Sequence, residues 1–594
     1  MRHVFLGLLT STVIASPAFS QQAADAVAPE AATTGGFEAI SPAVAASLTA
    51  KEAGQPVEAD NWMIAAANPH AVEAGAEVLR AGGTAADAMV AVQAVLGLVE
   101  PQSSGLGGGA FLVWFDAESG KLTTLDGRET APLNATPTLF QNEDGEPLKF
   151  FDAVVGGRSV GTPGTPALMA EAHRRWGQAE WSSLFEAGTK LAKDGFAVSP
   201  RLAGLIERDA ERLSRFPRTA DYFMPDGNAL QAGDLLTNDD YAHTLKVLAE
   251  KGAEGFYMGR VADEIVGAVT HAPGNPGVLS LADLALYQVK EREPVCVTYR
   301  EFDVCGMGPP SSGALTVGQI LGMLGQYDLA TLGAENPESW RLIGDASRLA
   351  FADRGRYMAD SDYVPMPTQG LANPDYLAQR AELLGGDDAL PEVSPGSPEF
   401  DHALWADDES IELPSTSHIS IVDQYGNALS MTTTIENAFG SRLMVHGFLL
   451  NNELTDFSFR THRDGVPIAN RLEPGKRPRS SMAPTIVMQD GKPVLAIGSP
   501  GGSRIIGYVA KSIIAWADWG MDVQQAVALP HAVNRFGKYD LEEGTDAEML
   551  EENLSQIGFE VSIRGLNSGL HAIEIGDLLK GAADPRREGI ALGE

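Results

Sequence analysis

The sequence predicts a mixed α/β (α+β) fold with helices concentrated early in the chain and strands late. Between about residues 160 and 390, apolar residues recur mostly with helical spacing. After Ser415 the pattern changes to alternating strands separated by glycine turns. Hydrophobic residues make up 44% of the 594 residues, which is enough for a substantial core. We therefore expect a folded chain with a helix-rich first part and a strand-rich last part.

The charge balance argues against several classes of partner. The formal net charge is −36, so the chain would be repelled by phosphate backbones and by anionic membranes. No basic run offsets this charge, and we expect no nucleic-acid partner. Beyond the N-terminus, no stretch is long and apolar enough for a membrane span.

The N-terminus has the pattern of a secretory signal peptide. Arg2 and His3 precede an apolar stretch that is too short to cross a bilayer. Small residues then allow cleavage after Ala18 or Ser20. The alternative is a buried N-terminal helix. We interpret residues 1–20 as a signal peptide and expect a periplasmic or secreted protein.

The next segment, residues 21–60, is rich in Ala, Glu, Thr and Pro and predicts a flexible lead-in. Two helices are predicted after it, over 70–81 and 85–98. The glycine run in SSGLGGGAF, which begins at Ser103, leads into a strand. It lacks the Lys-Ser/Thr of a phosphate loop and the spacing of a dinucleotide fingerprint, so it predicts no nucleotide cofactor.

The chain has two cysteines, Cys296 and Cys305, in PVCVTYREFDVC. If Arg300 and Glu301 form a turn, the two cysteines lie opposite each other on paired strands. A cross-strand disulfide and a pair of buried thiols both fit this pattern. No His and no second Cys pair lies nearby at ligand spacing, so no metal site is expected.

A β-hairpin is predicted over LPSTSHISIVDQYGNALSMTTT, which begins at Leu413. Gly426 suits the left-handed position of its turn. If Val422 pairs with Ala428, counting outward pairs Thr416 with Thr434. Their Cβ atoms would then lie ~5 Å apart on one face, provided that the register does not slip.

A threonine hydroxyl is a poor nucleophile unless a base removes its proton. His418 would share the face of Thr416, but the sequence shows no order typical of a serine triad. An N-terminal threonine instead uses its own α-amino group as the base. That solution requires a cut between Ser415 and Thr416. A polar, acidic connector over residues 391–410, expected to be exposed and mobile, fits such a cut.

Several long motifs resemble the γ-glutamyltransferases (γ-glutamyltranspeptidases) and cover nearly all of the chain after the lead-in. They include AGGTAADAMVAVQAVLGLVEPQSSGLGGGAF, DGRETAP, TSHISIVDQYGNALSMTTTIENAFGS, GFLLNNELTDFS, GKRPRSSMAPTIV and GSPGGSRII. The resemblance implies a four-layer αββα sandwich of the N-terminal nucleophile hydrolase type. It also implies self-cleavage of one precursor into a large subunit, residues 61–415, and a catalytic small subunit, residues 416–594.

The resemblance also assigns site residues. Thr416 becomes the nucleophile, and Thr434 is the threonine whose hydroxyl contacts it. Gly501 and Gly502 form the oxyanion hole, where backbone N–H groups approach the developing charge closely. The substrate-binding residues fall on Arg128, Ser480 and Ser481 for the α-carboxylate and on Glu436, Glu453 and Asp456 for the α-ammonium.

Some positions depart from the common family pattern. Many members have Asn at the position of Glu436 and Gln at that of Glu453. The loop between Asp456 and Ser480 is shorter than in many members and lacks their lid tyrosine. The shorter loop without the tyrosine indicates a more open acceptor side.

The implied activity is a γ-glutamyl hydrolase/transferase acting on glutathione and other γ-glutamyl amides, without metal or organic cofactor. The alternative enzyme is a cephalosporin- or glutaryl-type acylase with the same kind of nucleophile. A third alternative is a non-catalytic exported binding protein, whose chain would stay whole.

Overall fold

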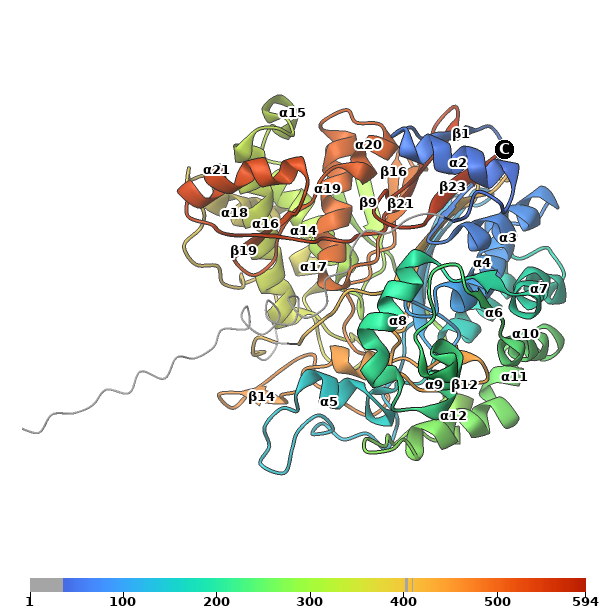
Figure 1. Ribbon diagram of the computed structural model, residues 1–594. Coiled ribbons are helices and arrows are strands. Elements are labelled where there is room, and N and C mark those ends of the chain that lie inside the picture. The colour runs from blue at the N-terminus through green and yellow to red at the C-terminus, as the bar shows by residue number, and fades with distance from the viewer. Residues whose placement is uncertain (1–35, 401–403, 409) are drawn as a thin grey trace, which may run out of the picture.

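A computed structural model describes residues 36–400, 404–408 and 410–594. The predicted signal peptide lies outside these residues. Two seven-stranded antiparallel sheets pack face to face, and helices cover both outer faces (Figure 1). This is the αββα sandwich that the resemblance implies.

The first sheet has the order β23-β2-β10-β11-β3-β4-β7 and holds the predicted hairpin at its centre. Its strands are Ile590–Gly593, Met63–Ala66, Ser417–Val422, Ala428–Thr434, Gly109–Asp116, Lys121–Gly127 and Lys290–Arg292. Strands from before and after residue 416 therefore share one sheet. A cut at that residue would leave the two parts joined by the backbone hydrogen bonds of β10 to β2 and of β11 to β3.

The second sheet has the order β1-β22-β21-β17-β16-β9-β8. Its strands are Val57–Ala59, Leu579–Ala583, His571–Ile575, Lys492–Gly498, Thr485–Gln489, Phe302–Gly306 and Val295–Tyr299. At its edge Cys296 pairs with Cys305, as the sequence predicts, and the two form a disulfide. Arg300 takes the positive φ of 56° in the turn between them.

Three apolar clusters hold the four layers together. Figure 1 shows α3, α4 and α6 on one side of the sheets and α14, α16 and α19 on the other. These helices are Pro69–Arg80, Ala85–Val99, Thr165–Trp176, Gly313–Leu324, Pro337–Tyr357 and Ile505–Ala517. One cluster lies between each helical layer and its sheet, and a smaller one, which includes Val113, Val422 and Ile486, lies between the sheets.

The helices α3 and α4 begin and end within a residue or two of the predicted bounds, and their capping residues explain why. The Asn68 side chain caps α3 by accepting from the backbone N–H of His70, and a proline occupies its first turn. Thr84 and Asp87 form a capping box at the start of α4. All of α4 is buried, which explains its nearly continuous apolar sequence.

In place of the flexible lead-in predicted up to residue 60, residues 42–52 form α2 (Pro42–Glu52). Ser41 caps this helix, and its alanine-rich sequence favours helix. Lys51 Nζ donates to the backbone carbonyls of Arg587 and Gly589, at 2.8 and 2.7 Å. These contacts fasten α2 to the C-terminal region next to β23.

Smaller elements complete the described chain. The further helices are α5 Phe150–Val154, α7 Glu186–Asp194, α8 Pro200–Leu213, α9 Pro217–Phe223, α10 Asp239–Lys251, α11 Glu254–Tyr257, α12 Arg260–Thr270, α13 Leu281–Leu286, α15 Leu329–Leu332, α17 Thr368–Leu371, α18 Pro374–Ala381, α20 Val523–Ala528 and α21 Glu551–Gln556. The further strands are β5 Phe196–Ala197, β6 Leu235–Leu236, β12 Met444–Val445, β13 Phe448–Leu449, β14 His462–Arg463, β15 Val466–Pro467, β18 Ala532–Asn534, β19 Lys538–Glu542 and β20 Glu560–Arg564. Among the described helices, none is long and apolar enough to cross a membrane.

Candidate active site

The hairpin of β10 and β11 has the predicted register. Val422 pairs with Ala428, and the pairing continues to Ser417 and Thr433. The next residue outward, Thr416, donates a hydrogen bond from its hydroxyl to the hydroxyl of Thr434, 3.1 Å away. The two threonines that the resemblance singles out therefore touch.

The backbone at Thr416 has an unusual conformation. Thr416 has φ of 90°, a region that a β-branched L-residue adopts only under strain of about 1–3 kcal/mol. The chain is continuous here, and the Gly501 N–H donates to the carbonyl of Ser415 at 3.2 Å. Arg587 Nη1 donates to the carbonyl of Thr416 at 3.2 Å. The carbonyl that a Thr416 hydroxyl would attack is thus already polarised by a backbone donor.

Gly501 and Gly502 lie between β17 and α19. Their backbone angles and close contacts leave no room for a side chain. Their φ values are 135° and 57°. A Cβ on Gly501 would lie 2.8 Å from a ring carbon of Tyr508, and one on Gly502 would lie 2.9 Å from the carbonyl oxygen of Leu413. This close packing brings the backbone of the loop against the bond between Ser415 and Thr416.

His418 does not act on the Thr416 hydroxyl in this arrangement. Its ring nitrogens contact the hydroxyls of Thr432 and Ser420, at 2.9 and 3.0 Å. Burial, reinforced by the nearby His571, lowers the pKa of His418 well below its usual value. A neutral imidazole occupied on both sides leaves the role of base to another group.

Beside Thr416 lies a small pocket, which we call the donor pocket. Its lining residues are Arg128, Glu412, Leu413, Thr416, Thr434, Glu436, Glu453, Asp456, Ser480, Ser481, Met482, Gly502 and Ile505. All the predicted site residues except Gly501 are among them. The free space is about 20 Å³, room for roughly one water molecule. A larger ligand therefore requires part of this lining to move.

Arg128 is paired with acids in the uncut chain. It is fully buried, and its Nη1 and Nη2 contact the carboxylates of Glu453 and Asp456, respectively. Its Nε donates to the Pro478 carbonyl at 3.2 Å, and Nη2 also donates to the Arg479 carbonyl at 2.9 Å. The guanidinium that the resemblance assigns to the substrate carboxylate is thus surrounded by protein acceptors.

Acids outnumber cations around Arg128. Glu129, Glu436, Glu453 and Asp456 are all buried. Burial, followed by the nearby Glu453, raises the pKa of Glu436 to about 8. Burial also raises the pKa values of the other three acids, against the lowering effect of Arg128. Within the described structure, one oxygen each of Glu453 and Asp456 lacks a hydrogen-bond partner. The pocket therefore offers buried carboxyl groups and free acceptor oxygens to a cationic ligand group, whose charge would favour the ionised form of these acids.

The two serines also line the donor pocket. Ser480 Oγ accepts from the backbone N–H of Met482 at 3.1 Å. Ser481 Oγ donates to the carboxylate of Glu412 and accepts from Arg354 Nη2 at 2.7 Å. Sequence reasoning missed Glu412 and Arg354. They lie 58 residues apart, and no local pattern links them.

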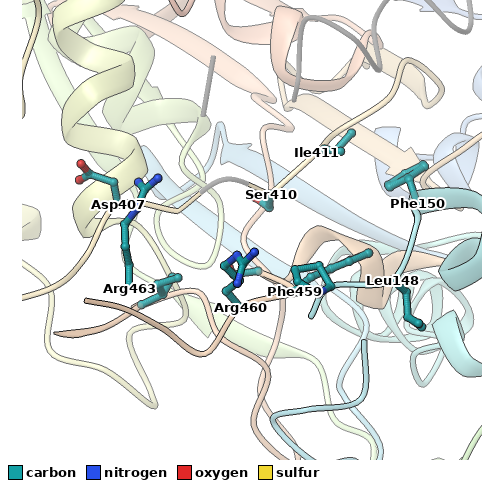
Figure 2. A pocket seen from close by; sticks show the side chains of 11 residues that line it. Leu148, Phe150, Asp407, Ser410, Ile411, Phe459, Arg460 and Arg463 are labelled. Atoms are coloured by element: carbon teal, nitrogen blue, oxygen red, sulfur yellow. The ribbon is translucent and has the colours of Figure 1, made fainter. Parts of the chain in front are cut away.

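The connector is less exposed than its composition predicts. Leu404 is 78% exposed, but Asp408 is only 8% exposed and pairs with Arg479 at 2.8 Å. Ser410 and Ile411 line a cavity of about 220 Å³, shown in Figure 2, while Glu412 lines the donor pocket.

That cavity has an apolar part and a charged part. Figure 2 shows Leu148, Phe150 and Phe459 together, and Arg463 near Asp407. The chain therefore passes from the wall of this cavity into the donor pocket just before Thr416.

Known proteins match the chain over most of its length. The model of the γ-glutamyltranspeptidase family matches residues 71–594. The chain belongs to this family. A glutathione hydrolase proenzyme from Bacillus subtilis strain 168 is 36% identical over 545 residues, covering 89% of this chain and 91% of the relative. The acylase ACY 1 proenzyme of Pseudomonas sp. strain SE83 is 30% identical over 544 residues, covering 90% and 94%.

Among solved structures, a cephalosporin acylase from Bacillus halodurans superposes with a TM-score of 0.80. The match covers 91% of this chain and 97% of that one, at 24% identity. This likeness shows the shared fold. As a member of the γ-glutamyltranspeptidase family, the protein is a self-processing enzyme with a threonine nucleophile.

The Thr434 hydroxyl links the nucleophile candidate to the start of the next segment. Replacing Thr434 with Val keeps the shape of the side chain but removes the hydroxyl that accepts from Thr416 and, at 2.8 Å, from the Glu436 N–H. We expect self-cleavage and turnover to slow by about 10-fold, as for one lost hydrogen bond that orients a reacting group. Time-resolved gel analysis and steady-state kinetics measure both rates.

Thr433→Val is the matched control for Thr434→Val. The hydroxyl of Thr433 is also buried but has no hydrogen-bond partner in the described structure. The control should cleave and turn over as the wild type does. Equal rates in Thr434→Val and wild type would show that the contact between the two threonines does not orient Thr416.

Proposed function

We propose that the mature protein is an exported γ-glutamyl hydrolase/transferase in which Thr416 is the N-terminal nucleophile. The observation that carries the proposal is the placement of the paired Thr416 and Thr434 hydroxyls beside a pocket with an excess of buried acids. The name of the Bacillus subtilis relative supports glutathione as one donor. The signal-like sequence of residues 1–20 supports a periplasmic or extracellular location.

Maturation proceeds by attack of Thr416 on its own preceding peptide bond. The Thr416 oxygen adds to the Ser415 carbonyl carbon, and the Gly501 N–H stabilises the resulting oxyanion. The C–N bond breaks, and the Thr416 nitrogen takes up a proton, which leaves an ester between Ser415 and the Thr416 oxygen. Water then hydrolyses the ester, which yields a carboxylate on Ser415 and a free amino group on Thr416.

In turnover, the freed amino group serves as the base. Its unperturbed pKa of about 7.7–8.0 suits proton transfer near neutral pH. The Thr416 oxygen adds to the γ-amide carbonyl of the donor, the amine leaves with a proton, and an acyl-enzyme remains. Water releases glutamate in hydrolysis, and an amine acceptor takes the glutamyl group in transfer.

The donor pocket distinguishes the two charged groups that the donor's α-carbon carries, the ammonium and the carboxylate. Glu436, Glu453 and Asp456 receive the α-ammonium, because all three are buried acids and one oxygen each of Glu453 and Asp456 has no hydrogen-bond partner in the described structure. The α-carboxylate lies on the side of Arg128, Ser480 and Ser481. A glutaryl donor lacks the ammonium and would leave the acids unpaired.

Matched anilide donors test this assignment. We expect kcat/KM for the γ-glutamyl anilide to exceed that for the glutaryl anilide by at least ~10-fold, which is about 1.4 kcal/mol of discrimination. Asp456→Ala should reduce this preference more than it reduces glutaryl turnover. A wild-type preference for the glutaryl anilide would instead favour the activity named for the acylase relatives.

The same ratio of kcat/KM values should rise with pH up to about 8. The raised pKa of Glu436, about 8, means that this acid is largely protonated at pH 6.5 and ionised above pH 8.5. Only the ionised acid attracts an ammonium, so the γ-glutamyl donor gains relative to the glutaryl donor as the pH rises from 6.5 towards about 8. Above that pH the donor's own α-ammonium, with an ordinary pKa of about 7.7–8.0, loses its proton and the ratio falls again. Comparing the ratio cancels the titration of the Thr416 amino group, which both donors share. A flat ratio would contradict ammonium binding by these acids.

A further inference from the structure

The loop that carries the Gly501 N–H is held by charged side chains that lie outside the donor pocket. We call residues 501–504 the oxyanion loop. Its first two residues are glycines, so only its last two, Ser503 and Arg504, have side chains that can fasten it. Both are buried, and they belong to the short turn that leads into α19. The contacts of these two side chains therefore help to fix the position of the Gly501 N–H.

Two residues of the C-terminal region hold these side chains. Arg535 Nη1 donates to the hydroxyl of Ser503 at 2.7 Å. Arg504 donates to one carboxylate oxygen of Asp540 through Nη2 and Nε, at 2.8 and 3.3 Å. Arg535 Nη2 donates to the same oxygen at 3.4 Å. Asp540 and Arg535 thus join the two consecutive loop residues in one hydrogen-bonded network.

This network is anchored on a small sheet. Asp540 lies in β19, the middle strand of the order β18-β19-β20, so backbone pairing holds it on both sides. Arg535 directly follows β18. Arg504, Arg535 and Asp540 are each only 4% exposed. Charge-assisted hydrogen bonds are directional and are stronger away from water, so the network fixes the oxyanion loop relative to this sheet.

The network lies close to the reacting bond along the chain but contributes nothing to the walls of the donor pocket. Ser503 is two residues from Gly501, whose N–H donates to the Ser415 carbonyl at 3.2 Å. None of the described residues that line the donor pocket comes from β18, β19 or β20. A change in the network should therefore move the oxyanion donor and leave the groups that bind the substrate in place.

We propose that Asp540 and Arg535 are positioning residues for the oxyanion donor, because they hold Ser503 and Arg504 so that the Gly501 N–H faces the reacting carbonyl. The proposal rests on the proposed function for the turnover reaction. Self-cleavage tests it without any donor, since the same N–H acts in both reactions. Neither positioning residue touches the reacting atoms, and their effect passes through the oxyanion loop.

Asp540→Asn keeps the size of the side chain and removes the charge that Arg504 and Arg535 share. We expect kcat for the γ-glutamyl anilide and the rate of self-cleavage each to fall about 10-fold. This is part of the ~10²–10³-fold loss that follows when an oxyanion donor is removed outright. KM should stay within about 2-fold, because acylation and deacylation use the same oxyanion donor and the donor pocket keeps its lining.

Two inhibitors separate the oxyanion donor from the rest of the pocket. 2-Aminobutyrate carries the α-ammonium and the α-carboxylate but no group that reacts with Thr416. 2-Amino-4-boronobutanoate also accepts the Thr416 oxygen on its boron. The hydroxyl proton then passes to the Thr416 amino group, and the resulting tetrahedral boronate is an anion that resembles the transition state.

In Asp540→Asn, Ki should rise about 10-fold for the boronate and by less than about 2-fold for 2-aminobutyrate. A purely structural defect would weaken both inhibitors alike. An equal rise in both constants would therefore overturn the proposal, and so would an unchanged rate of self-cleavage.

Ser503 supplies a second test, which holds if Asp540→Asn fails to fold. Ser503→Ala removes the hydroxyl that accepts from Arg535 and should lower kcat and the self-cleavage rate about 5-fold, as for one lost hydrogen bond. Ser503→Thr retains a hydroxyl and should keep both rates within about 2-fold of the wild type. Equal rates in the two variants would contradict the role of this contact.

Asp518→Asn is the matched control at the other end of α19. Asp518 directly follows this helix, about 20 Å from the oxyanion loop at a rise of about 1.5 Å per residue. Its buried carboxylate also accepts from an arginine, Arg300 Nε at 2.8 Å. The control should lower the denaturation midpoint, as Asp540→Asn does, and leave kcat, self-cleavage and both Ki values unchanged.

An equal fall of kcat in Asp518→Asn and Asp540→Asn would attribute the effect to general destabilisation and overturn the proposal. A wild type that cleaves itself but does not turn over the γ-glutamyl anilide would contradict the proposed function instead. The comparison of self-cleavage rates between wild type and Asp540→Asn would then still decide the role of the network.

Discussion

Thr416→Ala is expected to leave one uncut chain and to lower kcat/KM for a γ-glutamyl anilide by at least ~10⁴-fold, the scale on which loss of a nucleophile acts. The variant lacks the oxygen that attacks the Ser415 carbonyl, so neither the ester nor the free amino group can form. It therefore loses nucleophile and base together. Denaturing gels and donor kinetics measure both losses.

Two further variants make the test specific to the Thr416 hydroxyl. Thr416→Ser retains an oxygen and should still cleave, more slowly. Ser417→Ala removes the neighbouring hydroxyl, which contacts Glu100 and Ser104 at 3.3 Å instead of Thr416, and should cleave normally. Cleavage and turnover in Thr416→Ala at wild-type rates would rule out Thr416 as the nucleophile.

Gly501→Ala is expected to slow both self-cleavage and turnover by ~10²–10³-fold, the range seen when one oxyanion donor is lost. The new Cβ would lie 2.8 Å from the ring of Tyr508, at a φ of 135° that alanine rarely adopts. The loop must shift, which moves the N–H that donates to Ser415. Initial rates of fragment appearance and kcat for the anilide measure the effect.

Gly491→Ala is the control for strain alone. Gly491 also has a positive φ, 77°, in the turn between β16 and β17, and no atom lies within 4 Å of its added Cβ. This variant should lose some stability but keep its cleavage rate. Equal slowing in Gly491→Ala and Gly501→Ala would attribute the effect to backbone strain instead of to the oxyanion donor.

Local sequence patterns predicted the features that depend on neighbouring residues. The pairing of Thr416 with Thr434 follows from strand alternation and one glycine turn, and it holds in the structure. The pairing of Cys296 with Cys305 follows in the same way. In each case the turn fixes the register, and the register fixes which side chains meet.

Features that depend on distant segments were not predictable. Arg128 meets Glu453 because two segments more than 300 residues apart pack together. Glu412 meets Arg354 through the packing of two segments that lie 58 residues apart. Only the resemblance to other proteins placed Arg128 in the site. It did not reveal that the Arg128 guanidinium pairs with Glu453 and Asp456 in the uncut chain.

The helix α2 was missed for another reason. The serine before Pro42 and the alanines after it form a helix-start signal, but the acidic and proline-bearing surroundings indicated a linker. Contacts of Lys51 with the C-terminal region, which no local pattern reveals, add to the stability of this helix. A short helix in isolation would be marginal in water.

N-terminal sequencing of the smaller fragment locates the self-cleavage of the chain. The purified protein should separate into two chains on a denaturing gel. Edman degradation of the smaller chain should read Thr-Ser-His-Ile-Ser, which places the cut between Ser415 and Thr416. A fully active protein with a single intact chain, or a fragment that begins at any other residue, would contradict the account.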